Sequence, residues 1–353
     1  MQIGASEPRA EPQPQFMPTI EKYLGYCIRS AMKIIDSMRT SEALPFPQLI
    51  ESIEQAFCGG AYSPPRQHFA IPREGGADIT LILMPAWQMD GYIGVKIVSV
   101  APDNAAKGLP AICASYLLMD GATGQPQFLI DGPVLTARRT AAVSALAARY
   151  LAPERSETHL VIGAGAVAGC AARSHRHIRP ITRTLIWARN AEKAQRLCEE
   201  LSTEGLDARP VDDLDSAVAS ADIVTTATLA CEPVLRGRAL KSDVHLDLIG
   251  AYLPHMREAD DAAIARSTIY ADNPEGALSE TGELAIPLAN GVIKRNDLRG
   301  GLADLIANTA SGWQRPPGKT VFKSVGMALS DLAAATCAVK CLDRQAGSSQ
   351  TVS

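Results

Sequence analysis

The sequence lacks an apolar run long enough to cross a bilayer, and only 5% of its 353 residues are aromatic. The formal net charge of -4 gives no reason to expect binding to nucleic acid or to an anionic membrane. Residues 1–20 combine charged residues and prolines without an apolar core, so we expect a disordered extension and no secretory signal. The remaining composition, 46% apolar and 20% charged, is that of a globular protein, and the length predicts two domains.

Several motifs of known chemistry are also missing. The eight cysteines form no C-x-x-C pair, and the six histidines show no metal-ligand spacing, so we expect reduced thiols, no metal site and a cytoplasmic location. The sequence contains no G-x-S-x-G elbow, no H-E-x-x-H motif and no Walker loop. These absences disfavour hydrolases of the serine and zinc types and the P-loop nucleotidases.

The most informative feature that is present is a glycine-rich turn. The apolar run at 159–162 ends at Gly163 and Gly165, and small residues follow, beginning with Ala166, Val167 and Ala168. In a dinucleotide-binding turn the glycines let the backbone turn sharply and approach a pyrophosphate, which then lies at a helix N-terminus. An ordinary strand-to-helix turn is the alternative, but a second predicted strand at 184–188 has the position that a βαβ unit requires.

The end of this second strand bears on the choice of coenzyme. An acidic residue there would favour NAD(H) through the ribose hydroxyls, but this chain has Arg189 and Asn190, with Lys193 and Arg196 further along. Arg189 can pair with a 2′-phosphate, so we expect NADPH, with NADH also possible as a substrate. The alternative interpretation is that these basic residues form the solvent-exposed start of a helix and bind no phosphate.

The order of the predicted elements indicates the fold class. Strands expected at 80–87, 92–100, 114–119 and 127–130 follow a helix at 46–57 and form an antiparallel sheet. From residue 160 onward, strands expected at 160–163, 184–188, 222–226, 244–250 and 268–271 alternate with helices that start near residues 166, 191, 213 and 260. This alternation predicts a doubly wound parallel sheet in an α/β protein. A helix at 135–151 leads from the first part to the second, and a long amphipathic helix follows residue 325.

Three cations outside the predicted nucleotide-binding part are candidates for substrate chemistry. Lys96 interrupts an apolar strand, and a lysine in a partly dry site has a pKa that the surroundings can move. Arg139, beside Arg138, lies near a predicted helix start, where a bound carboxylate would offset the unfavourable helix dipole. Arg66 follows two prolines that fix where its side chain emerges. For each cation, simple exposure to solvent is the alternative interpretation.

With these residues, the chain resembles the ornithine cyclodeaminase/μ-crystallin family over about residues 40–340. The resemblance is carried by Leu83-Met-Pro-Ala-Trp87, Gly94-Val-Lys96, Arg139-Thr-Ala-Ala, the Gly163 turn, Gly250-Ala-Tyr-Leu-Pro254, Met256-Arg-Glu258 and Phe322-Lys-Ser-Val-Gly326. At the place of Tyr252, ornithine cyclodeaminases have an aspartate, so the chain looks closer to the branch that reduces cyclic ketimines.

The resemblance implies a substrate-binding and dimerisation domain at 21–135 plus 322–345 and a Rossmann domain at 136–321, with a disordered tail at 346–353. It also implies that Arg66, Lys96 and Arg139 line the substrate pocket, where the two arginines hold the carboxylate and Lys96 assists at the carbon–nitrogen centre. Lys323 and Ser324 match a segment that lies beside the coenzyme in relatives. The cofactor-binding residues predicted in all are Gly163, Gly165, Ala166, Val167, Arg189, Asn190 and Lys323.

The function implied is NAD(P)H-dependent reduction of Δ1-pyrroline-2-carboxylate to L-proline and of Δ1-piperideine-2-carboxylate to L-pipecolate by a homodimer. Three alternatives stay open at this point. They are an ornithine or lysine cyclodeaminase or amino-acid dehydrogenase, an NADPH-binding protein of the crystallin type with negligible turnover, and an opine-like synthase.

Overall fold

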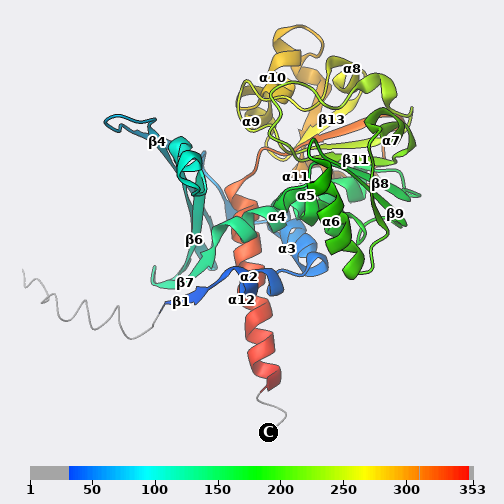
Figure 1. The fold of residues 1–353 in the computed structure, drawn as a ribbon. Helices are drawn as coiled ribbons and strands as arrows, with labels where there is room; N and C mark the ends of the chain where they lie inside the picture. The colour runs from blue at the N-terminus through cyan, green and yellow to red at the C-terminus, as the bar shows by residue number, and fades with distance from the viewer. Residues whose placement is uncertain (1–31, 310, 350–353) are drawn as a thin grey trace, which may run out of the picture.

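Two β-sheets organise residues 32–309 and 311–349, which are the residues that the computed structural model describes (Figure 1). The extension predicted at 1–20 lies outside the described residues, and so do 350–353 of the predicted tail. No helix in the described ranges is both long and apolar enough to cross a membrane.

The first sheet is mixed and has seven strands. Its strands are β1 (Lys33–Ile35), β2 (Ala61–Tyr62), β3 (Gln67–Ile71), β4 (Ile79–Gln88), β5 (Tyr92–Val100), β6 (Ile112–Asp120) and β7 (Pro126–Asp131). They follow the order β1-β7-β6-β5-β4-β2, with β3 also paired to β4, and every pair except β1–β7 is antiparallel. The four strands predicted for this part are confirmed as β4 to β7, whereas the short β1, β2 and β3 were not predicted.

Helices cover one face of this sheet. They are α2 (Ser37–Glu42), α3 (Phe46–Cys58), α4 (Gly132–Leu151) and α12 (Ala328–Ser349), while a 3₁₀ helix, η1 (Pro102–Lys107), follows β5. The helix α12 packs against α3, α4, β4 and β5, so the end of the chain returns to the first sheet as the sequence predicts (Figure 1). Leu49, Ile50 and Ile53 of α3 and Leu135 and Leu146 of α4 are fully buried in the resulting core.

The second sheet has eight strands, all parallel. Its strands are β8 (Thr158–Ile162), β9 (Arg183–Trp187), β10 (Ala208–Pro210), β11 (Ile223–Thr226), β12 (His245–Leu248), β13 (Thr268–Ala271), β14 (Leu298–Gly301) and β15 (Thr320–Lys323). Their order is β10-β9-β8-β11-β12-β15-β13-β14. This is the predicted doubly wound α/β fold, and the strand order reverses at β8, which has β9 on one side and β11 on the other. Ligands bind at such a switch point, outside the carboxyl ends of the strands.

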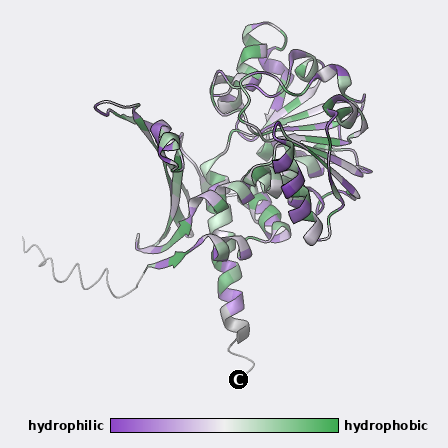
Figure 2. Ribbon diagram, in the orientation of Figure 1, coloured by the Kyte–Doolittle hydropathy of each residue, from purple (hydrophilic) through white to green (hydrophobic). Residues whose placement is uncertain are grey.

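Helices flank the second sheet on both sides (Figure 1). They are α5 (Ala166–His175), α6 (Ala191–Thr203), α7 (Leu214–Ser220), α8 (Asp261–Ile264), α9 (Pro274–Ser279), α10 (Gly282–Ala289) and α11 (Leu302–Thr309), with 3₁₀ turns η2 (Gly237–Ala239) and η3 (Arg295–Asp297). The predicted starts of the first four agree with the structure within one residue. The helix α6 is amphipathic: much of its ribbon has the colour of hydrophilic residues in Figure 2, while Leu197 and Leu201 are buried.

The structure differs from the sequence prediction at both ends of the nucleotide-binding part. The boundary predicted between residues 321 and 322 falls inside β15, which pairs with β12 and β13 and belongs wholly to the second sheet. The boundary at 135/136 falls inside α4, which packs against strands of both sheets. The two-domain division itself therefore stays a prediction, because α4 is shared.

The final helix is also longer than predicted. A disordered tail was expected from residue 346, but α12 continues to Ser349, so that part of the prediction is wrong. Once a helix has formed, each further residue adds a hydrogen bond at little nucleation cost, and this favours continuation through polar residues.

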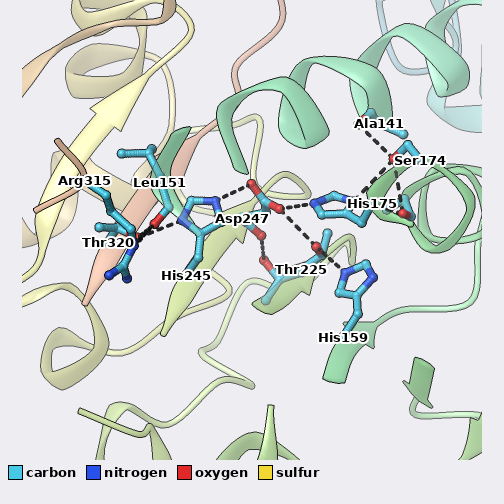
Figure 3. A network of polar contacts seen from close by, with 12 residues as sticks. Ala141, Leu151, His159, Ser174, His175, Thr225, His245, Asp247, Arg315 and Thr320 are labelled. Carbon is cyan, nitrogen blue, oxygen red and sulfur yellow. Dashed lines mark hydrogen bonds and ion pairs between the residues drawn. The ribbon is translucent and has the colours of Figure 1, made fainter. Parts of the chain in front are cut away.

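A buried polar network ties the second sheet to α4 and α5 (Figure 3). The Asp247 carboxylate on β12 lies 2.6 Å from Nε2 of His175 on α5 and 3.1 Å from Nε2 of His245. Thr225 on β11 donates to the same carboxylate at 3.2 Å and lies 2.9 Å from Nε2 of His159 on β8. The network links three neighbouring strands to a covering helix by side chains that are fully buried.

Candidate active site

The glycine-rich turn after β8 has the backbone geometry that dinucleotide binding requires. Gly163 has a φ of +131°, and a Cβ there would lie 2.5 Å from the Ala227 carbonyl oxygen, so only glycine fits. The helix α5 begins at Ala166, and its N-cap, Gly165, offers no capping side chain. The amides of this first turn are therefore available to an anion such as a pyrophosphate.

A cavity of about 380 Å³ opens beside this turn, at the carboxyl ends of β8, β9 and β11. Its walls include four of the predicted cofactor-binding residues, Gly163, Gly165, Arg189 and Asn190. The other predicted residues of the turn, Ala166 and Val167, form the first turn of α5 next to the cavity but are not part of its wall.

The residues after β9 shape the outer end of this cavity. The Asn190 side chain caps α6 by accepting a hydrogen bond from the Lys193 amide at 3.0 Å. Arg189 forms no ion pair within the described part of the chain, and Lys193 also lines the cavity. This end of the cavity therefore carries positive charge and no acidic side chain, which suits a phosphate.

The part of the cavity wall that follows β11 was missed by the sequence prediction. Ala227, Thr228 and Leu229 follow β11 and face the glycine turn across the switch point. Glu258 holds this segment in place, accepting hydrogen bonds from the Thr228 amide and hydroxyl at 2.7 Å each. The available signal was topological, because β11 is the strand that a doubly wound fold places next to β8.

The predicted substrate cations Lys96 and Arg139 lie together in the interior. Lys96 is on β5 and Arg139 is on α4, and both are at least 95% buried. Both contact Asp331 on α12, whose carboxylate lies 2.8 Å from Lys96 Nζ and 2.7 Å from Arg139 Nε. The alternative interpretation, in which these cations face solvent, is wrong for both residues.

Burial changes the proton affinity of the lysine. The loss of solvation lowers the pKa of Lys96, the Asp331 carboxylate opposes this effect, and the nearby Arg139 adds to it, which leaves a pKa of about 8. Lys96 therefore changes its charge near neutral pH, where a proton donor for an imine is useful.

The Arg139 guanidinium keeps donors for a further anion. Its Nε is taken by Asp331, whereas its buried Nη1 has no hydrogen-bond partner among the described residues. The end of the guanidinium lies against Gly326, where a Cβ would approach Nη2 to 3.1 Å. Gly326 has a φ of +83°, so glycine suits both the turn and this close approach.

Arg66 reaches the same turn from the other side. It donates to the carbonyl oxygens of Val325 and Gly326 at 3.1 and 3.2 Å, and forms a 2.8 Å ion pair with Glu280. A cavity of about 330 Å³ is lined by Arg66, Glu280 and Gly326, among other residues. The structure thus brings the three predicted cations together around the turn between β15 and α12.

Lys323, which was predicted to belong to the coenzyme site, lies in the interior on β15. It is fully buried, and its amine donates to the carbonyl oxygens of Leu248 and Ala251 at 3.1 and 2.7 Å. It lines neither cavity and lies beneath the loop that follows β12. Its neighbour Ser324 donates to Asp272 at 3.2 Å, and Asp272 also accepts from the amides of Val325 and Gly326.

Known proteins match this chain along most of its length. The model of the ornithine cyclodeaminase/mu-crystallin family matches residues 29–343. The Δ1-pyrroline-2-carboxylate reductase of Colwellia psychrerythraea is 34% identical over 313 residues, covering 88% of this chain and 99% of that protein.

Two solved structures have the same fold along nearly their whole length. The Thermococcus litoralis Δ1-pyrroline-2-carboxylate reductase in complex with NADH and L-proline matches with a TM-score of 0.82 and 31% identity, covering 89% of this chain and 98% of that one. An archaeal alanine dehydrogenase dimer with bound NAD matches with a TM-score of 0.79 and 26% identity, covering 89% and 97%.

Proposed function

The chain belongs to the ornithine cyclodeaminase/mu-crystallin family, and we propose that it uses NAD(P)H to reduce cyclic imino acids. Its substrates are Δ1-pyrroline-2-carboxylate, which gives L-proline, and Δ1-piperideine-2-carboxylate, which gives L-pipecolate. The observation that carries this proposal is the pair of buried cations, Lys96 and Arg139, beside a turn that Arg66 also contacts. A cluster of this kind suits a small carboxylate that is held away from water.

Gly163, Gly165, Arg189 and Asn190 would hold a nicotinamide coenzyme, which would supply a hydride when bound. The first turn of α5 would offer its amides to the pyrophosphate, and Arg189 would pair with the 2′-phosphate of NADPH. Lys323 supports the loop after β12 from beneath.

The chain's own residues orient the acid and provide a proton. Arg139 offers its free Nη donors to the carboxylate, and Arg66 offers a second guanidinium once it exchanges Glu280 for the substrate. Lys96 gives a proton to the imine nitrogen, so that the nitrogen gains N–H as the carbon gains the hydride, and Lys96 regains its proton from water. Holding the reactants in this arrangement contributes about 7–11 kcal/mol relative to free encounter.

Substitution of Lys96 tests this assignment. We expect Lys96→Ala to lower kcat at least 100-fold, because general acid catalysis contributes about 10²–10⁴-fold, while the affinity for NADPH stays unchanged. The measurement is steady-state turnover together with a coenzyme titration. Unchanged turnover would remove Lys96 from the mechanism.

A substrate panel tests the function itself. Purified protein is given NADPH or NADH with each cyclic imine or with pyruvate plus an amine, and NAD⁺ with ornithine or lysine. Consumption of NADPH with the cyclic imines supports the proposal. Ammonia release from ornithine would indicate a cyclodeaminase, pyruvate-dependent turnover would indicate an opine-type synthase, and coenzyme binding without turnover would indicate a binding protein.

We further propose that two copies associate through the uncovered face of the first sheet. The helices α2, α3, α4 and α12 lie on the other face (Figure 1). The register puts Phe69, Ile71, Trp87 and Ile97 on the uncovered face, where each is more than a third exposed. An apolar sheet face of this kind is typical of an interface. Ile97→Lys is expected to convert the dimer to a monomer in analytical ultracentrifugation.

The interior thiols support a cytoplasmic location for this dimer. Cys198 and Cys337 are buried as free thiols, which is the usual state in a reducing compartment.

A further inference from the structure

Asp331 is the acidic residue on which the two buried cations depend. It lies in the first turn of α12, and its side chain has no exposed surface. Lys96 Nζ is 2.8 Å from Oδ2 and 3.0 Å from Oδ1, and Arg139 Nε is 2.7 Å from Oδ1. One carboxylate thereby links β5, α4 and α12.

The charges around this point need an anion. Two buried cations without a counter-ion would be strongly destabilising, because each loses its hydration. Asp331 neutralises one of the two charges and leaves one, which is the right balance for a monoanionic substrate. The other nearby cation, Arg66, has its own carboxylate in Glu280.

Every element packed around Lys96 contributes to its environment. Asp331 faces Lys96 from α12, Arg139 from α4 and Arg66 from the segment before β3. Tyr116 is the residue of β6 opposite Lys96 in the strand pairing. Burial raises the pKa of Tyr116 well above its usual value, so this phenol stays neutral. Asp331 is the only negative charge among these four groups.

Asp331 also decides which edge of the Arg139 guanidinium remains open. Its bond to Nε fixes the plane of the group, and the unpartnered Nη1 then lies at the Gly326 turn. A carboxylate bound there can receive two parallel N–H donors from one planar group.

We propose that Asp331 is a positioning residue of this enzyme, which keeps the Lys96 ammonium charged and turns the open edge of Arg139 toward the substrate carboxylate. The proposal deepens the proposed function and rests on it for the identity of the substrate. It assigns a role to an acid that acts through the two cations that it contacts.

Asp331→Asn tests the role, because it removes the charge at nearly constant size. The neighbours that remain, Arg139, Arg66 and Tyr116, are cationic or neutral, so the titration midpoint of Lys96 should fall by at least one pH unit. The midpoint is measured by NMR from the Cε–Hε signals of ¹³C-labelled lysine. The Lys96 signal is assigned by its loss in Lys96→Arg. The basic limb of the kcat/KM profile for Δ1-pyrroline-2-carboxylate should move down by the same amount. At pH 8, kcat/KM should fall at least about 5-fold, since the charged fraction of Lys96 falls from about one half to about one eleventh.

Two further variants separate charge and position from folding. Asp331→Glu keeps the charge one methylene further out, so the Lys96 midpoint should stay near that of the wild type while kcat/KM falls at least 10-fold. Asp343→Asn removes an exposed charge from the same helix and should change neither quantity.

The outcomes are distinct. An unchanged Lys96 midpoint in folded Asp331→Asn overturns the proposal, and if that variant does not fold, unchanged kcat/KM in Asp331→Glu overturns it instead. A wild-type protein that reduces neither imine, but whose Lys96 midpoint still falls in Asp331→Asn, would contradict the proposed function and leave the electrostatic role of Asp331 standing.

Discussion

Arg66 and Arg139 were predicted together as residues that hold the substrate carboxylate, but they occupy different environments. Arg139 is fixed by a buried carboxylate, whereas the partner of Arg66, Glu280, is 42% exposed and comes from the segment after α9. An exposed ion pair contributes little to stability and exchanges its partner readily. Arg66 is therefore the adjustable member of the pair, and Arg139 is the fixed one.

Arg189 carries the prediction about coenzyme choice. Arg189→Ala is expected to raise the dissociation constant of NADPH about 10-fold or more, since a hydrogen bond to a charged group contributes about 1.5–3 kcal/mol, and to leave that of NADH nearly unchanged. The measurement is a fluorescence titration with both coenzymes. Arg196→Ala on the helix that follows, α6, is the control, because this exposed arginine does not line the cavity. Equal weakening of both coenzymes would assign Arg189 no role in the choice.

At the scale of single residues, the sequence was informative where a residue type conflicts with its surroundings. A lysine within an apolar strand indicates a site of chemistry, and glycines directly after a strand indicate a close approach of the backbone. Asp331 gave a weaker signal, since one acid on a predicted amphipathic helix is ordinary. Its role depends on Lys96 and Arg139, which are 235 and 192 residues away in the chain.

At the scale of elements, β5 and β13 were predicted with the bounds that the structure shows, because each is an apolar run that ends at turn residues or polar positions. The short strands β1, β3, β10 and β14 could not be predicted. Strands of three to five residues take their conformation from the neighbour with which they pair, and that neighbour is chosen by tertiary structure.

The turn between β8 and α5 permits a test at this scale. Gly163→Ala places a Cβ 2.5 Å from the Ala227 carbonyl oxygen in a backbone conformation that glycine favours. We expect at least 10-fold weaker NADPH binding and a lower Tm, measured by titration and calorimetry. Gly205→Ala is the matched control, since φ is +80° there but no atom lies within 4 Å of the new Cβ. It should lower Tm and leave NADPH binding unchanged, and the same binding loss in both variants would refute the argument.

At the scale of the whole molecule, the polar network of the second sheet predicts a dependence of stability on pH (Figure 3). Burial lowers the pKa of His159 well below its usual value and also lowers that of His245. Each stays neutral when folded but takes up a proton when unfolded, so stability is retained above about pH 6.5 and is lost as the pH falls below it, by about 1.4 kcal/mol per pH unit for each group.

Glu283 acts in the opposite direction, which decides the design of the test. Burial and the nearby Glu258 raise the pKa of Glu283 to about 7, although Lys323 opposes them, so its contribution to stability is lost as the pH rises through that value. The wild type should therefore be compared with His159→Gln, because Glu283 makes the same contribution to the pH dependence of stability in both proteins. Between pH 6.5 and 5.5 the variant should lose about 1 kcal/mol less free energy of unfolding in urea titrations, and equal losses would contradict the account.

The overall architecture was predictable because the alternation of strands and helices fixes the parallel sheet, and the resemblance fixed the family. The place of β15 was not, since a strand at residue 320 that inserts between β12 and β13 follows from pairing and not from its own sequence. For the same reason the predicted domain boundary fell within it.

The insertion of β15 has a mechanical consequence. The chain passes between the two sheets twice, through α4 and through the segment after β15, and the two passages touch where Arg139 meets Gly326. A change at Gly326 therefore acts on both connections between the two sheets at once.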